Sequence, residues 1–224
     1  MSKSLWERAR ALGTPRHHFE SAMAALLGTP WWAWFVPFLI GGCVLLLMQT
    51  PLGWITDKRI EEVLGPIIMG ITAAIAIHGY WRSRGFLTLI LAIFCCALFF
   101  REWHFWSSST GFVLAFAFLL WWASMGRDEL KPWLAQPRVR GLLTSAMWTY
   151  FISQVLDRNI LLSLPDYLSW HNNVEETLEN SGHLMVLALV LTVQRAGVLT
   201  GGVSPARPLV SAVKPRRARR PAGA

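Results

Sequence analysis

Six long runs of apolar residues divide this sequence of 224 residues, and they constrain its fold more than any other feature. A helix needs about 20 apolar residues to cross the ~30 Å of hydrocarbon in a bilayer. The runs therefore predict an all-α, polytopic integral membrane protein with six transmembrane helices. These spans are expected at 31–49, 63–81, 85–100, 107–125, 141–156 and 182–198. The third and fifth are short, and flanking aromatic residues are expected to complete their crossings.

The composition excludes an ordinary soluble domain and argues against a nucleic-acid-binding protein. Apolar residues make up 54% of the chain and charged residues only 15%, and 13 Trp and 12 Phe suit the interfaces of a membrane. The formal net charge is +8. However, the basic residues lie in short loops and at the termini, between apolar runs, so a membrane surface explains them better than nucleic acid does.

The distribution of Lys and Arg predicts the orientation of the spans. With the N-terminus in the cytosol, 17 of the 21 basic residues fall on the cytosolic side. Short cytosolic loops carry such an excess in membrane proteins, so both termini are predicted inside. The acidic residues show the opposite bias, because 9 of the 13 fall on the outer side.

Three segments are predicted along the chain. Residues 1–30 form a cytosolic or interfacial lead-in, and residues 31–198 form the six-helix transmembrane domain. Residues 199–224 are rich in Gly, Pro and Arg and contain no apolar pattern that could pack into a core. This last segment is expected to be a disordered basic tail that attracts anionic lipid headgroups.

The start of the last span carries the most unusual group of ionisable residues. Glu175, Glu176 and Glu179 are followed by His183, after which the chain becomes almost entirely apolar. On a helix that turns 100° per residue, Glu176, Glu179 and His183 fall within about 60° of one another. The sequence therefore predicts a polar ridge at the outer mouth of the sixth span.

The ridge has a candidate partner at the outer end of the third span, where Arg101 and Glu102 are followed by His104. Carboxylates and imidazoles from two helices suit Zn, Mn or Fe. The candidate cluster comprises Glu102, His104, Asp157, Glu175, Glu176, Glu179 and His183. Its candidate metal ligands are Glu102, His104, Glu179 and His183, which could hold a divalent ion that activates water.

Two other interpretations of these residues stay open. The carboxylates could pair with Arg101 or Arg158, which would make the cluster a structural ion-pair network. They could also handle ions or protons, as ionisable groups within membranes often do. A polar stripe on the fifth span, Ser145, Thr149, Ser153 and Asp157, is expected to bond neighbouring helices or, alternatively, to line a polar cavity.

Two short motifs carry a resemblance. Arg101-Glu102-x-His104-Phe105 and Glu175-Glu176-x-x-Glu179 resemble an uncharacterised group of small bacterial six-helix inner-membrane proteins, over the second half of the chain. The resemblance implies a bacterial inner membrane and no particular activity. A more distant similarity is to ceramidase-like membrane hydrolases, which hold zinc with three histidines, a serine and an aspartate in seven helices. This chain lacks the paired His-x-x-x-His of that pattern.

Three functions are compatible with these features. The first is a non-enzymatic component of the membrane that binds lipids or a membrane-protein partner. The second is a metal-dependent membrane enzyme, such as a lipid hydrolase. The third is a small transporter, although the sequence shows no internal repeat of the kind that many transporters contain.

Overall fold

The computed structural model describes residues 28–103, 117–121, 123, 127–158, 163 and 166–199. Within these ranges the chain forms helices and turns and contains no strand, which confirms the all-α prediction. The helices are α3 (Trp32–Met48), the short 3-10 helix η1 (Gly53–Thr56), α4 (Lys58–Ser83), α5 (Phe86–Glu102), α7 (Arg127–Leu134), α8 (Pro137–Asp157) and α9 (Tyr167–Leu199).

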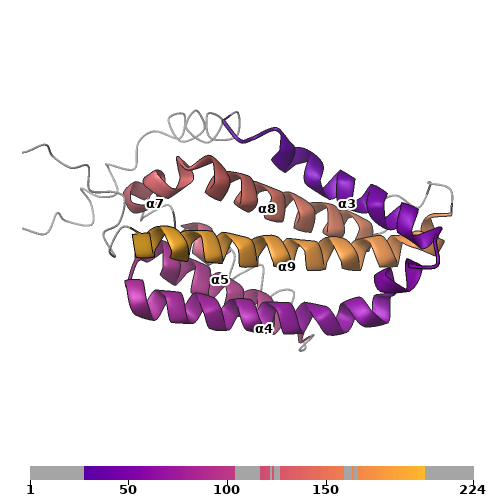
Figure 1. Cartoon of the computed structure of the whole chain (residues 1–224), viewed down its shortest axis with the longest axis horizontal. Coiled ribbons are helices and arrows are strands. Elements are labelled where there is room, and N and C mark those ends of the chain that lie inside the picture. The colour runs from indigo at the N-terminus through magenta and orange to yellow at the C-terminus, as the bar shows by residue number, and fades with distance from the viewer. Residues whose placement is uncertain are drawn as a thin grey trace, which may run out of the picture.

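Helix α9 forms the centre of the bundle. It runs between α8 and α4 in Figure 1, and it contacts α3, α4, α5, α8 and η1. Helix α3 packs against both α8 and α9, and α5 packs against α4. The long helices lie roughly along a common axis, so their ends gather at the two ends of the bundle (Figure 1).

Four of the predicted spans coincide with helices to within a few residues, and these helices are α3, α4, α5 and α8. Helix α9 begins at Tyr167, well before the predicted start at residue 182. The turns before residue 182 contain many polar residues. Helix α9 packs against α3, α4 and α8, and this packing supports the helix beyond its apolar part. Helix α7 was not predicted. Most of the predicted span 107–125 lies outside the described residues, as do nearly all of the lead-in and the basic tail.

Local signals explain where α4 begins and ends. The side chain of Asp57 accepts a hydrogen bond of 2.9 Å from the backbone N–H of Arg59, which satisfies one of the free N–H groups of the first turn. At the other end, Arg84 adopts a left-handed backbone with φ of 51°, and its N–H bonds the carbonyl of Tyr80. This turn reverses the chain into α5.

Two apolar clusters fill the bundle, with polar residues between them. The larger lies among α4, α5, α8 and α9 and includes Met69, Leu98 and Val186. The smaller includes Val44 and Leu178 and lies among α3, α8 and α9. Along α9, buried Glu179, Asn180 and His183 come between Leu178 of one cluster and Val186 of the other.

Of the described helices, α4 is the one that is both long enough and apolar enough to cross a membrane, and 33% of its apolar window is buried. Helix α3 is apolar but has only 17 residues. A helix of this length spans about 25 Å at 1.5 Å per residue, which is less than the hydrocarbon thickness. The six-span topology is therefore not confirmed and stays a prediction.

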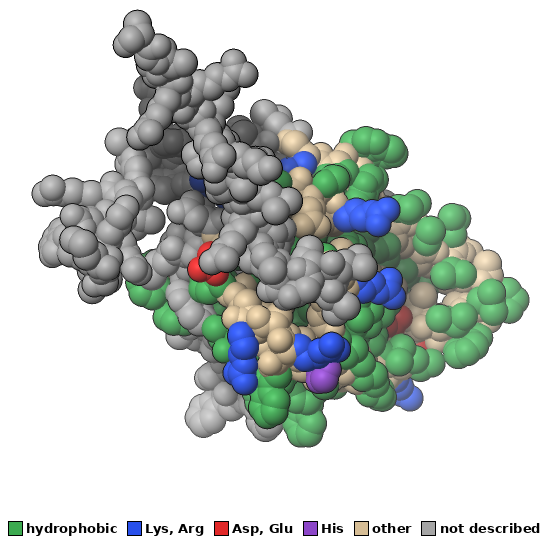
Figure 2. Space-filling model, turned by 60° about the vertical axis from the view of Figure 1, so that its left-hand side comes forward, with side chains coloured by type: hydrophobic (Ala, Val, Ile, Leu, Met, Phe, Trp, Pro, Cys, Tyr) green, Lys and Arg blue, Asp and Glu red, His purple; other side chains and the backbone are tan. Residues whose placement is uncertain are grey.

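Charge is distributed unequally between the two ends of the bundle. Figure 2 views the end where α4 and α9 finish and α8 begins, and Lys and Arg side chains gather there among hydrophobic ones. The basic residues on these helix ends include Arg82, Arg84, Arg138 and Arg140. The opposite end, where α4 and α9 begin, contains most of the acidic residues of the described part.

Candidate functional site: a buried glutamate and histidine cluster

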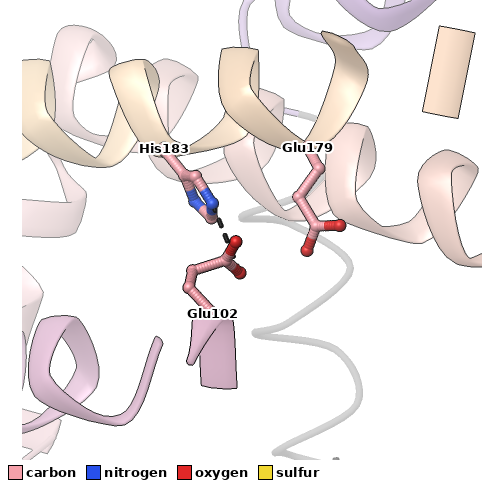
Figure 3. A group of neighbouring side chains, drawn as sticks. All are labelled: Glu102, Glu179 and His183. Atoms are coloured by element: carbon pink, nitrogen blue, oxygen red, sulfur yellow. Dashed lines mark ion pairs between the residues drawn. The ribbon is translucent and has the colours of Figure 1, made fainter. Parts of the chain in front are cut away.

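Three ionisable side chains meet in the polar layer of the bundle. Glu102 comes from the last turn of α5, and Glu179 and His183 lie one turn apart on α9. One potential ligand atom from each of them lies within 4.8 Å of the other two. Figure 3 shows Glu102 and His183 pointing toward one another, with Glu179 directed into the same space. The structure thus brings together three of the four metal ligands predicted from the sequence.

His183 is fully buried, and its two ring nitrogens face different partners. Nδ1 lies 2.6 Å from the hydroxyl oxygen of Tyr150 on α8, within hydrogen-bond distance. Nε2 lies 3.4 Å from Oε1 of Glu102 and has no hydrogen-bond partner among the described residues. The contact with Tyr150 therefore holds the ring so that Nε2 faces the two carboxylates.

Gly182 allows Tyr150 to approach this closely. A Cβ atom added to Gly182 would lie 3.0 Å from two carbons of the Tyr150 ring, closer than side chains normally pack. The absence of a side chain at position 182 therefore lets the phenol lie flat against α9 and reach His183.

Arg101 places a positive charge beside the carboxylates. It forms an ion pair with Glu179, and its guanidinium lies 3.8 Å from Oε1 of Glu102. Its side chain is only 18% exposed, so solvent screens these pairs weakly.

A second set of polar contacts joins the cluster to α4. Asn180 donates Nδ2 hydrogen bonds to Oε2 of Glu61, at 2.5 Å, and to the backbone oxygen of Glu61, at 2.9 Å. Thr177 donates to Oε1 of Glu61 at 3.3 Å. Glu61 is buried, with 6% of its surface exposed, so these donors replace the water that an ionised carboxylate would otherwise require.

Gly65 brings α4 close to this layer. A Cβ atom at Gly65 would lie 2.8 Å from Oε2 of Glu102 and 3.0 Å from Oδ1 of Asn180. Two oxygen atoms from different helices therefore converge over the bare backbone of α4.

The remaining predicted residues lie outside this centre. Glu176 pairs with Lys58 at 3.4 Å, so the predicted ridge divides, with Glu179 and His183 facing the cluster. Asp157 is half exposed and lies 4.0 Å from Arg158 at the end of α8. His104, the fourth predicted ligand, lies outside the described residues.

Glu175 lies near the cluster without contacting it. Burial raises the pKa of its carboxyl group to about 7, and the negative charges of Asp157, Glu176 and Glu179 add to this effect, while Lys58 opposes it. Burial also raises the pKa of Glu176, although Lys58 opposes the shift.

Two hydroxyls of the predicted stripe on α8 contact neighbouring helices, while the buried hydroxyl of Ser153 has no hydrogen-bond partner among the described residues. Ser145 donates to the backbone oxygen of Ala33 on α3 at 3.2 Å, and Thr149 contacts the sulfur of Met185 on α9 at 3.8 Å. Both are buried, as is Ser153. These contacts agree with the expectation that the stripe bonds neighbouring helices.

Sequence reasoning missed Tyr150, Glu61, Asn180 and Gly65 as parts of this layer. Each is recruited across helices that are far apart in the chain, and no local motif indicates their partners. Asn180 offered the clearest signal, because an amide beside Glu179 at the mouth of an apolar run must find a buried partner.

Comparisons with known proteins give no assignment. No family model matches the chain, and no curated protein or solved structure is significantly similar to it.

Proposed function

We propose that this chain is a multi-pass helical protein of a bacterial inner membrane and that Glu102, Glu179 and His183 bind a divalent metal ion. The observation that carries the metal proposal is the position of His183 Nε2, a buried nitrogen without a hydrogen-bond partner in the described part, facing two carboxylates. A buried polar atom of this kind normally has a partner.

Apolar side chains on the outer surface of the bundle support a location in the membrane. Large apolar side chains cover the outer faces of the helices, including Phe35 and Leu39 on α3 and Val63, Ile67 and Ile71 on α4, which are 52% to 68% exposed. Between its two apolar clusters, the interior holds carboxylates, hydroxyls and an imidazole. Exposed apolar surface of this extent suits lipid better than water.

The separation of charge supports the orientation predicted from the sequence. The end of the bundle rich in Lys and Arg would face the cytosol (Figure 2), following the distribution found in membrane proteins. The cluster would then lie near the outer surface, at the level where α9 changes from polar to apolar.

The chemistry of the cluster suits a cation with a charge of +2. Its ligands are two carboxylates and one imidazole, a set that binds Mn, Fe or Zn in helical bundles.

Elemental analysis of the purified full-length protein tests this proposal. We expect the wild type in detergent, after dialysis against micromolar Mn²⁺, Fe²⁺ or Zn²⁺, to retain one ion per chain. The double variant Glu179→Gln, His183→Asn removes one carboxylate charge and the imidazole, so it should lose the ion. A wild type that retains none of the three ions would overturn the proposal.

A second candidate function rests on the ion pair between Arg101 and Glu179. In this alternative the chain is a membrane component that binds lipids or a partner, and the cluster serves to hold α5 against α9. Wild type and double variant would then both lack metal, and the double variant would only be less stable.

A further inference from the structure

We infer that Asn180 provides a fourth ligand to the metal ion through its side-chain oxygen Oδ1, and that Glu61 holds the amide in the orientation that this requires. The inference rests on the proposed metal site. It adds to the ligand set the residue that directly follows Glu179 on α9.

The orientation of the Asn180 amide follows from its two partners. Both atoms that face Nδ2, Oε2 of Glu61 at 2.5 Å and the Glu61 backbone oxygen at 2.9 Å, are hydrogen-bond acceptors. The reversed amide would direct its oxygen at these two oxygens, so only the amino group can face Glu61. Oδ1 therefore points away from Glu61.

The position of Oδ1 relative to the cluster follows from Gly65. Oδ1 of Asn180 and Oε2 of Glu102 lie 3.0 and 2.8 Å from the same point above the Gly65 backbone. Glu102 in turn contacts His183 at 3.4 Å. Asn180 thus presents a carbonyl oxygen next to the carboxylate of Glu102, which itself faces His183.

Asn180 is part of the buried interior of the bundle. It is 6% exposed, and its side chain makes no hydrogen bond in the described part other than those donated to Glu61. The hydrogen bonds to Glu61 use the amino group, so Oδ1 stays available to accept a ligand bond from a cation. Glu61 acts here as a positioning residue, because it fixes the direction of Oδ1 without facing the site.

The enlarged ligand set narrows the choice of metal. Two carboxylates, one amide oxygen and one imidazole form an oxygen-rich site. Oxygen ligands suit Mn²⁺, while thiolate and thioether ligands select soft ions such as Cu⁺. We therefore expect Mn²⁺ or Fe²⁺ to be favoured over Cu⁺.

Mn²⁺ binding to the full-length protein in detergent tests the role of Asn180. Electron paramagnetic resonance of free Mn²⁺ in a titration gives Kd for the wild type and for Asn180→Leu, which has a similar volume but no ligand oxygen. We expect Asn180→Leu to raise Kd at least tenfold. The matched control is Gln194→Leu, eleven residues beyond His183, which removes a partly buried amide of α9 that donates to the backbone oxygen of Ile75. This control should leave Kd within twofold of the wild type.

A second variant, in which the carboxylate and amide groups at positions 61 and 180 are exchanged, tests the inference if Asn180→Leu does not fold. In the variant Glu61→Gln, Asn180→Asp, the new Gln can donate to the new Asp, whose second oxygen then faces the site. We expect its Kd to be within threefold of the wild type or lower. A folded Asn180→Leu that binds as tightly as the wild type, or a folded swapped variant that binds no Mn²⁺, would overturn the inference. A wild type that binds no Mn²⁺, Fe²⁺ or Zn²⁺ would instead overturn the proposed function itself.

Discussion

Oε1 of Glu102 lies 3.4 Å from Nε2 of His183, and this contact joins the end of α5 to the middle of α9. Neither residue could form the site alone, because 81 positions separate them in the chain. The cluster exists only when α5, α8 and α9 pack together, so variants of its supporting residues should alter stability as well as binding.

Arg101 and Arg158 differ in burial and should differ in their effect on stability. We expect Arg101→Ala to lower the free energy of unfolding by about 3 kcal/mol, because it leaves a buried carboxylate without its cation. Arg158→Ala is the control. Its side chain is 75% exposed and 4.0 Å from Asp157, so the loss should be below about 1 kcal/mol. Thermal unfolding in detergent would measure both, and equal losses would contradict the buried ion pair.

Glu175 should make stability depend on pH. Its pKa is about 7 in the folded protein and about 4.5 in the unfolded chain, so the folded state binds the proton more tightly. The contribution of Glu175 to stability is therefore greatest below pH 4.5 and is lost as the pH rises through 7.

We expect Glu175→Gln to be more stable than the wild type at pH 8, by on the order of 1 kcal/mol after allowing for partial solvent screening. The difference should disappear at pH 4.5. Unfolding midpoints between pH 4.5 and 8 provide the measurement, and Glu62→Gln, whose side chain is half exposed, provides a control with a smaller effect. A difference that is constant with pH would contradict the assignment.

Gly65 and Gly42 allow a matched test of close packing. Ala should improve helix propensity at both positions by up to about 1 kcal/mol. A Cβ at Gly42 meets nothing within 4 Å, whereas one at Gly65 would contact the oxygens of Glu102 and Asn180. We therefore expect Gly65→Ala to be less stable than Gly42→Ala by about 1–3 kcal/mol in thermal unfolding. Equal stability would show that the oxygens over Gly65 can move aside freely.

The sequence predicted the helical class and most helix positions because apolar runs of membrane length leave few alternatives to a helix. It also predicted that Glu102, Glu179 and His183 would meet. The two residues of α9 share a helical face, and Glu102 lies at the end of a neighbouring helix, so spacing and topology together indicated the contact.

The other contacts of the site depend on how the helices pack together, and the spacing of residues along the chain does not reveal this packing. Glu176 lies on the same helical face as Glu179 but forms an ion pair with Lys58 at the start of α4. Glu61 and Asn180 lie 119 positions apart, and nothing local to either residue indicates the other. Tyr150 reaches His183 only because Gly182 leaves room for its ring.

Reporter fusions test the membrane topology. Fusions after Arg84, Met125 and Ala224 should report the cytosol, and fusions near Lys58, Ser108 and Tyr167 should report the outside. The reason is the excess of Lys and Arg in the first set of segments. A C-terminus on the outer side would contradict both the number of spans and the location of the cluster.

The central claim is that the buried cluster binds a metal ion through His183. Electron spin echo envelope modulation of the Mn²⁺-loaded full-length protein would detect a histidine nitrogen bound to the ion. We predict a nitrogen coupling in the wild type and in His78→Gln, because His78 is exposed and lies on α4 near the opposite end of the bundle. The coupling should vanish in His183→Gln. Its presence in His183→Gln, or its absence from a wild type loaded with Mn²⁺, would contradict the claim.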